Sequence, residues 1–356
     1  MRFFILVLFM FFIEFGNPIF ATFYELNLSN SGAIEAILSQ KISPSGMIFQ
    51  SSSTFELGFH SENLWFQYTD FFRFTLPITT KIFNKTAKKY GIDPALLKAM
   101  IRVESSFFIH AVSKSNARGL MQLKFITARE NGALNSFSII QNVEAGCNYL
   151  SKLYKKFKSW DKAIAAYYVG PTTVKNRGIT ENARTYVKKV KKYWNYYKRT
   201  NKNENLRDLI WWSTGMELDI KGLKNLNLSF AIPVLGLCEF GTSVIISDKP
   251  TVILNPSFHL TDQISIGLSY DFKGSPIYSI KFQPSANDYH MFISSNFFDT
   301  LSFGLLIEKK FYSILFGAGE NGLSAGFVLN FDSIGFCGGF KNGFNTAIIF
   351  KPRNPW

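Results

Sequence analysis

Residues 93–105 read Asp-Pro-Ala-Leu-Leu-Lys-Ala-Met-Ile-Arg-Val-Glu-Ser. An aspartate that can cap a helix, followed by a proline at the first helical position, predicts that a helix begins here. Leu97, Met100, Ile101 and Glu104 fall at i, i+3, i+4 and i+7, so the carboxylate shares one stripe with three apolar side chains. A buried carboxylate is costly unless it is protonated or paired. Glu104 is therefore either a helix-edge glutamate paired with a Lys or Arg, or an acid whose pKa is raised by burial.

The segment from about residue 81 to residue 200 carries helical patterns throughout. The helix that begins at residue 93 is expected to end near residue 107, and further helices are expected over residues 142–157, 160–168 and 182–199. Gly170-Pro171 supplies a stop signal after the third of these helices. This region is expected to fold as an all-α domain over residues 81–200.

Residues 111–123 follow the first of these helices and read Ala-Val-Ser-Lys-Ser-Asn-Ala-Arg-Gly-Leu-Met-Gln-Leu. Gly119 would let the backbone turn tightly before a helix. Met121 and Gln122 are expected at the start of that helix, where an amide side chain can bond a sugar hydroxyl or an acetamido group. The ordinary alternatives are a core position for Met121 and a surface position for Gln122.

Four stretches of this region follow one another in an order that is typical of one family. They are Glu104-Ser105 with Ser113 and residues 117–123, then residues 142–146, then residues 165–167 with Gly170-Pro171, and finally residues 182–187. Together they resemble the lytic transglycosylase SLT domain over about residues 81–197. Four motifs in the right order are far more specific than any one of them.

The resemblance implies a goose-lysozyme-like fold with a single catalytic glutamate, Glu104. The expected reaction is cleavage of the MurNAc-GlcNAc β-1,4 bond of peptidoglycan with formation of 1,6-anhydromuramyl ends, and it requires no cofactor and no metal. The residues that the resemblance assigns to the glycan groove are Ser105, Ser113, Gly119, Met121, Gln122 and Tyr167. The hydroxyl of Tyr167 is expected close to Glu104.

The chain departs from the family pattern at several positions beside these motifs. Tyr168 and Val169 stand where the family usually has Asn-Ala, so one polar glycan contact is missing. Lys124 and Phe125 replace the common Met-Pro, and Asn182 stands where many members have Glu. None of these changes touches Glu104, so activity is still expected with a shifted subsite preference.

The spacing of acidic residues favours a mechanism with one carboxylate. No Asp or Glu occurs between Glu104 and Glu130, whereas most glycosidases use two carboxyl groups about 5 to 9.5 Å apart. Glu144, Asp161 or Glu181 could fold back to supply a second one. A lysozyme-type hydrolase on the same fold therefore stays an alternative, as does a non-catalytic glycan-binding module that anchors the β-region.

After about residue 203 the hydrophobic period changes from 3.6 to 2. Residues 263–272, 301–307 and 322–332 alternate apolar side chains with small or polar ones, and roughly ten such segments predict an antiparallel β-meander over residues 201–356. The whole chain is thus expected to be an α+β multidomain protein. The meander is either a soluble sheet or an outer-membrane barrel, and the Gly- and Ser-rich face opposite an aromatic face favours association with the outer membrane.

Residues 22–80 are expected to form an N-terminal segment with short strands, as around Phe55, Leu57 and Phe59. Two arrangements are open for this segment. If its strands join the C-terminal sheet, the helical domain is an insertion within a β-domain. If they do not, the helical domain is a separate unit that precedes the sheet.

The first residues predict export. Arg2 is followed by an apolar run over residues 3–13 and by a small residue, Ala21, which together describe a signal peptide over residues 1–21. An uncleaved N-terminal anchor is the alternative. The expected location is the periplasm or the outer membrane.

Composition narrows the class of partner. With 47% hydrophobic and 18% charged residues the chain can bury a sizeable core. Its formal net charge of +14 favours an anionic partner, such as the carboxylates of peptidoglycan stems. No nucleic-acid-binding motif is present. Three cysteines and four widely spaced histidines give neither a disulfide framework nor a metal motif.

Overall fold

The structure is a computed structural model with two compact units. It describes residues 53–60, 63–113, 115, 117–235, 237–246, 250–270, 272, 277–282, 289–296, 300–308, 312–319, 322–331, 334–340 and 344–353. The proposed signal peptide over residues 1–21 lies outside these residues. One unit, called the β unit below, contains the described residues of 53–72 and 209–353, and the helical unit contains those of 73–208.

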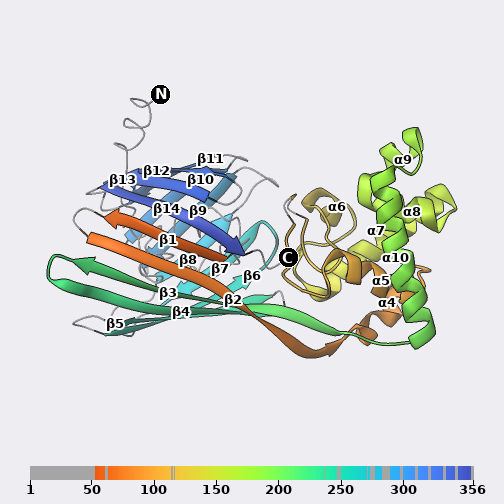
Figure 1. Cartoon of the computed structure of the whole chain (residues 1–356), viewed down its shortest axis with the longest axis horizontal. Helices are drawn as coiled ribbons and strands as arrows, with labels where there is room; N and C mark the ends of the chain where they lie inside the picture. The colour runs from red at the N-terminus through yellow and green to blue at the C-terminus, as the bar shows by residue number, and fades with distance from the viewer. Residues whose placement is uncertain are drawn as a thin grey trace. The chain divides into compact units, whose positions relative to one another are not determined.

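The helical unit contains one 3-10 helix and seven α-helices in the part that the structure describes (Figure 1). They are η1 (Thr80–Phe83), α4 (Asn84–Lys89), α5 (Pro94–Glu104), α6 (Phe125–Glu130), α7 (Ile139–Phe157), α8 (Trp160–Val169), α9 (Pro171–Arg177) and α10 (Glu181–Thr200). The four helices predicted from periodicity correspond to α5, α7, α8 and α10.

Helix α5 forms the centre of the helical core. The Asp93 carboxylate caps it by accepting a hydrogen bond from the Ala95 backbone N–H at 2.8 Å. Leu96, Leu97 and Met100 are each at most 1% exposed, and the helix packs against α10. Burial of each such side chain contributes roughly 1.5–3 kcal/mol, so α5 is held rigidly by both its cap and its apolar face.

One local prediction in this unit is wrong. Met121 and Gln122 do not begin a helix, because the next helix, α6, starts at Phe125. Gln122 has a φ of +46°, in the left-handed region that helical residues do not occupy. The stretch before α6 is therefore a compact loop.

The β unit is an antiparallel sheet of fourteen strands in the described residues. The strands are β1 (Ser53–His60), β2 (Asn63–Thr79), β3 (Asn205–Asp219), β4 (Gly222–Val234), β5 (Cys238–Ile246), β6 (Thr251–His259), β7 (Ile264–Ser269), β8 (Ile277–Phe282), β9 (Tyr289–Asn296), β10 (Thr300–Glu308), β11 (Tyr312–Gly319), β12 (Gly322–Asn330), β13 (Ile334–Phe340) and β14 (Phe344–Arg353). Strands β2 and β3 continue across the boundary into the helical unit.

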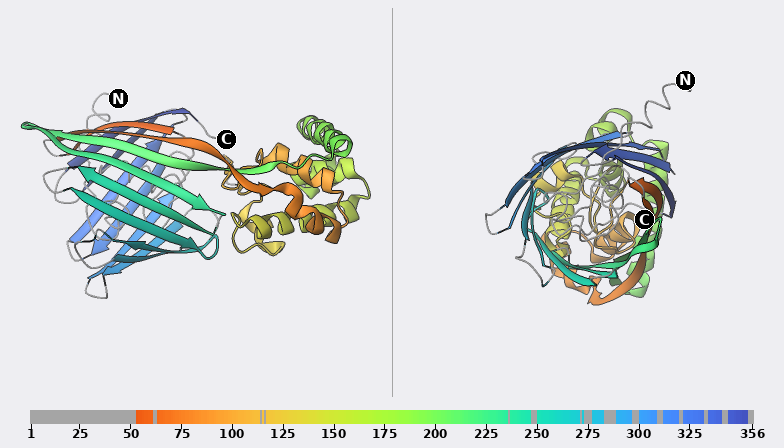
Figure 2. Two further views of the ribbon diagram at one scale, coloured as in Figure 1. Left: turned by 90° about the horizontal axis from the view of Figure 1, so that it is seen from below. Right: turned by 90° about the vertical axis from the view of Figure 1, so that its left-hand side faces the viewer.

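The strand order closes on itself. Strand β1 pairs with β2 through Leu57 and Phe66, and with β14 through Leu57 and Ile348. Figure 2, in its right-hand view, shows the strands of this unit arranged in a ring. The strands before the helical unit thus join those after it, which is the insertion arrangement that the sequence left open. The expected domain boundaries at 80/81 and 200/201 lie close to the end of β2 at Thr79 and of α10 at Thr200, whereas the compact units divide at 72/73 and 208/209, because the last residues of β2 and the first residues of β3 belong to the helical unit.

Large apolar side chains of the sheet are exposed at every second position. In β5 and β6 these side chains are Phe240, Val244, Ile246, Val252, Leu254 and Phe258, each at least 37% exposed. The period of two places them on one face of the sheet. Among the described helices, none combines the length and the apolar character needed to cross a bilayer.

Candidate active site

Glu104 is the last residue of α5, where the chain turns sharply away from the helix axis. Ser105 is the C-cap of the helix, with φ −127° and ψ −4°, and its backbone N–H and its hydroxyl both donate to the Ile101 carbonyl, at 3.0 and 3.1 Å. Ser106 and Phe107 then adopt positive φ values of 51° and 70°, conformations that non-glycine residues rarely take. Ser105 therefore fixes the end of α5, and with it the position of the Glu104 carboxyl.

The Glu104 carboxyl is half-buried and accepts a hydrogen bond from the hydroxyl of Tyr186 in α10. Burial raises the pKa of Glu104 to about 7, while the Tyr186 hydrogen bond and the positive charge of Lys189 act to lower this pKa. Such a carboxyl is part protonated near neutral pH, so it can give up a proton and take one back. Burial, followed by the charge of Glu104, raises the pKa of Tyr186 well above its usual value, so this hydroxyl remains a donor.

Gly119 and Asn142 determine the conformation of the loop over residues 111–123, which precedes α6. Gly119 has a φ of +77°, and a Cβ placed on it would lie 2.2 Å from the Ser136 carbonyl oxygen. The buried Asn142 amide donates to the carbonyls of Arg118 and Ser136 at 3.0 and 2.8 Å, and it accepts from the Met121 N–H at 2.7 Å. Asn142 thereby bonds two backbone groups of the loop and one of the segment that precedes α7, a role that its place in a helical pattern did not reveal.

Met121 and Gln122 follow Gly119 in this loop. Met121 is fully buried, and a Cβ on Gly146 of α7 would meet its side chain at 2.7 Å. The Gln122 amide donates to the carbonyls of Ala111 and Gly119, both at 2.9 Å. The positive φ of Gln122 is held by these bonds, a strained conformation of the kind that gathers at functional sites.

Tyr167 lies on α8, and its hydroxyl donates to the Met121 carbonyl at 2.7 Å. Burial raises the pKa of Tyr167 well above its usual value, and the charge of Glu104 adds to this rise. The two side chains are therefore electrostatically coupled, although the hydroxyl that bonds Glu104 belongs to Tyr186. Tyr186 was part of a sequence motif with no role assigned to it.

Ser113 organises the start of the same loop. Its hydroxyl accepts from the Ala117 N–H at 3.0 Å and lies 3.1 Å from the Ser115 hydroxyl. Its backbone N–H donates to the Ala117 carbonyl at 2.9 Å. Five of the six residues assigned to the groove belong to this hydrogen-bonded loop or bond to it, whereas the Ser105 hydroxyl bonds within α5, to the Ile101 carbonyl.

The three acidic residues that could have supplied a second carboxylate are engaged elsewhere. Glu144 pairs with Lys89 at 3.2 Å, Asp161 with Lys191 at 3.0 Å, and Glu181 with Arg184 at 3.9 Å. All three carboxylates are at least 39% exposed. The arrangement around Glu104 therefore favours one carboxyl acting alone.

Within the described residues, no three His, Cys, Asp or Glu side chains gather in a way that could hold a metal ion. Cys147 is a free, buried thiol in α7, and burial raises its pKa to about 12. It is a small apolar core residue rather than a nucleophile.

Part of the chain that holds this site is similar to a known protein family. Residues 81–190 match the family model described as the Transglycosylase SLT domain. The chain is 32% identical over 145 residues to membrane-bound lytic murein transglycosylase F of Desulfosudis oleivorans, covering 35% of this chain and 32% of that protein. It is 42% identical over 90 residues to membrane-bound lytic murein transglycosylase E of Buchnera aphidicola, covering 22% of this chain and 42% of that protein.

A solved structure of the 70 kDa soluble lytic transglycosylase of Escherichia coli is 25% identical, with a TM-score of 0.31, and covers 33% of this chain and 24% of that one. The chain thus spans less than half the length of the proteins it matches. Residues 81–190, which include Glu104 and the loop over residues 111–123, are thus similar to the Transglycosylase SLT domain.

Proposed function

We propose that the protein is a peptidoglycan lytic transglycosylase with Glu104 as its single acid and base. The observation that carries the proposal is the Glu104 carboxyl itself, buried enough to bring its pKa to about 7 and bonded by Tyr186. This carboxyl lies within residues 81–190, the segment similar to the SLT domain. Relatives of part of the chain are named lytic murein transglycosylases.

The proposed reaction has two proton transfers at one carboxyl. Protonated Glu104 gives its proton to the glycosidic oxygen between MurNAc and GlcNAc as that bond breaks. The N-acetyl group of the muramyl unit stabilises the cationic centre, and the carboxylate then takes the proton of the muramyl 6-hydroxyl as this oxygen attacks C1. The products are a free GlcNAc 4-hydroxyl and a 1,6-anhydromuramyl end. Intramolecular attack has a large advantage over attack by water, and Glu104 ends the cycle protonated.

The test is mass spectrometry of the products released from purified sacculi. The native protein is expected to release anhydromuramyl ends, and Glu104→Gln is expected to release none. Glu181→Gln is the matched control, because Glu181 is 79% exposed and pairs only with Arg184 in its own helix turn. Reducing muramyl ends would show a hydrolase, and activity retained in Glu104→Gln would remove Glu104 from the mechanism.

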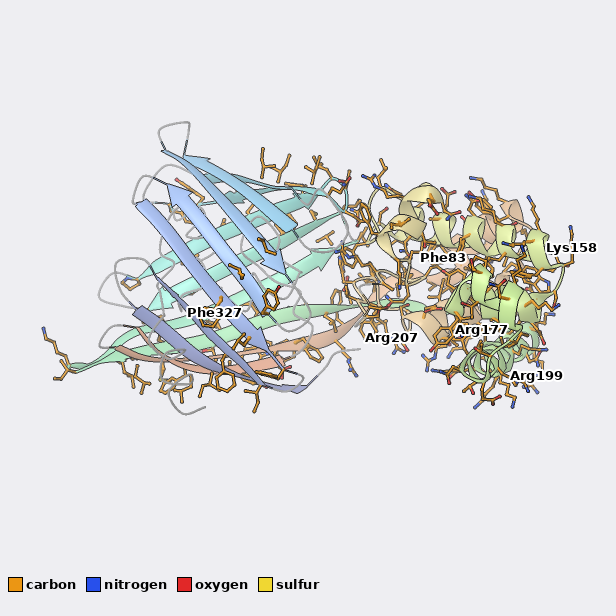
Figure 3. The ribbon with its side chains drawn as sticks, turned by 90° about the horizontal axis from the view of Figure 1, so that it is seen from above. Phe83, Lys158, Arg177, Arg199, Arg207 and Phe327 are labelled. Atoms are coloured by element: carbon orange, nitrogen blue, oxygen red, sulfur yellow. The ribbon has the colours of Figure 1, made fainter. Side chains whose placement is uncertain are left out.

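The charge of the helical unit supports a polyanionic substrate. Residues 73–208 hold 27 Lys and Arg against 8 Asp and Glu, a formal charge of +19, whereas the rest of the chain holds 12 against 17. Lys158, Arg177 and Arg199 are exposed on this unit (Figure 3). Peptidoglycan stems carry carboxylates that such a surface attracts. Sacculus binding is expected to weaken as salt rises from about 50 to 500 mM, since the Debye length shortens. Binding of equal strength at both salt concentrations would contradict a role for this charge in substrate binding.

We also propose that the β unit associates with the outer membrane after export. Three features support this: the strand order closes on itself, strands β5 and β6 each have nine residues, and large apolar side chains are exposed at alternate positions. A lipid-facing strand needs about 9–11 residues and this alternation. The test is fractionation of membranes from cells that make the protein. Recovery in the outer-membrane fraction, resistant to carbonate, is expected; recovery in the periplasmic fraction would favour the soluble sheet.

A further inference from the structure

Tyr168 forms an exposed aromatic surface beside the catalytic pair. It lies near the end of α8 and is 53% exposed. Its ring stacks on that of Tyr186, with ring centroids 4.6 Å apart and ring planes 9° from parallel. Tyr186 is only 9% exposed, and its hydroxyl bonds Glu104. One face of the Tyr168 ring therefore covers Tyr186, and much of the rest of the ring is open to solvent.

We propose that Tyr168 is a specificity-determining residue that stacks on the saccharide unit next to the bond being cleaved. The inference rests on the proposed function and adds to it one named contact with the glycan. Only the 4.6 Å stack of the two rings separates the Tyr168 ring from Tyr186, whose hydroxyl reaches Glu104, so a sugar on the open face of Tyr168 lies near the carboxyl.

The chemistry of the two partners fits. A β-linked pyranose presents an apolar face of C–H groups, and an aromatic ring offers a flat, apolar, rigid surface with a negative face that suits them. Tyr168 loses little conformational freedom on binding, because Tyr186 already fixes its ring. Asn, the residue that the family usually has here, would instead select the orientation of one hydroxyl or acetamido group. The chain thus replaces a directional contact by one that depends on ring shape.

Affinity is measured for the full chain in the Glu104→Gln background, so that no turnover occurs. The probe is a set of glycan strands freed of stem peptides, titrated by calorimetry. Tyr168→Ala and Tyr168→Leu are expected to weaken binding by roughly five- to thirtyfold, as expected for the loss of about 1–2 kcal/mol. Tyr168→Phe keeps the ring and is expected to restore affinity to within about twofold. Tyr168→Leu keeps apolar cover over Tyr186, so it remains informative if the alanine variant folds poorly.

The matched control is Tyr154→Ala, which removes a tyrosine of α7 whose ring stacks at 4.1 Å on that of Trp160. Unchanged affinity in Tyr168→Ala and Tyr168→Leu would overturn the proposal. An equal loss of glycan affinity in Tyr154→Ala, or no binding of the glycan strands by the Glu104→Gln chain, would overturn it too. If Tyr168 acted only by positioning Tyr186, replacing Tyr168 in the active chain would lower kcat and shift the pH profile of the rate without changing KM. That result would also overturn the proposal. If the native chain fails to cleave sacculi while Tyr168 still governs binding, the proposed function fails and the contact stands.

Discussion

Replacing Glu104 by Gln is expected to stabilise the helical unit at alkaline pH while it abolishes activity. The folded chain holds the Glu104 pKa at about 7, against 4.5 for the ordinary carboxyl. Between these two pH values the unfolded chain ionises and the folded chain does not, so the free energy of unfolding falls as pH rises. Each pKa unit corresponds to about 1.4 kcal/mol, which gives about 3 kcal/mol of lost stability above pH 7 and none below pH 4.5. Gln carries no charge at any of these pH values, so the Glu104→Gln chain does not lose this stability as pH rises.

The assay is hydrogen exchange of the full chain in rising urea, followed in peptides from α5 and α10, at pH 4, 6 and 8. The stabilisation by Glu104→Gln is expected to be near zero at pH 4 and to grow to about 2–3 kcal/mol at pH 8. Glu181→Gln, at an exposed ion pair, should give a flat profile. A difference between Glu104→Gln and native protein that is the same at every pH would refute the reasoning, because it would mean that burial does not shift the carboxyl.

Three further substitutions test the surroundings of Glu104. Tyr186→Phe removes a hydrogen bond that lowers the Glu104 pKa, so the alkaline limb of the rate profile should move to higher pH with about a tenfold lower kcat, as kinetics at several pH values will show. Asn142→Ala removes three hydrogen bonds to backbone groups, although the Arg118 carbonyl keeps its bond from the Leu123 N–H, and should cost about 1–3 kcal/mol of unfolding free energy in the same exchange experiment. Gly119→Ala places a methyl group against the Ser136 carbonyl and should lower kcat/KM about a hundredfold while circular dichroism shows the helices intact; full activity would show that the loop can shift freely.

Local signals were enough to predict the helix that presents Glu104. The cap at Asp93, the proline after it and the apolar stripe all act within a few turns, and the structure shows each of them. The positive φ of Gly119 was likewise predictable, since glycine adopts it without strain. Gln122 was not, because nothing in a glutamine signals a left-handed backbone; its conformation depends on bonds to two carbonyls elsewhere in the loop.

The remaining features depend on contacts between distant parts of the chain. Tyr186 reaches Glu104 across 82 residues only because α10 packs on α5. Asn142 reaches the loop across 21 residues to Met121. In the sheet, the pairing of β1 with β14 joins the first and last strands, and no period within either strand reports it. Periodicity identifies faces, whereas these partners are set by packing.

The helical unit is inserted in the sequence between strands β2 and β3 of the sheet. The two connecting segments lie side by side, since the Thr80 N–H donates to the Glu204 carbonyl at 2.8 Å and the Asn205 amide donates to the Leu76 carbonyl at 2.9 Å. Ends that meet in this way allow a domain to be inserted between neighbouring strands.

The same junction is tied to the two helices that carry Glu104 and Tyr186. Lys98 of α5 donates to the Lys202 carbonyl at 2.8 Å, just beyond the end of α10. The Trp194 ring N–H of α10 donates to Asp93, the cap of α5, at 2.7 Å. The start of α5 is thus fastened to α10 and its far end presents the carboxyl. Because all of these bonds lie between residues 73 and 208, a helical unit cut free at those two residues keeps them and should retain both its fold, measured by circular dichroism, and the geometry of Glu104 and Tyr186, measured by product release from sacculi.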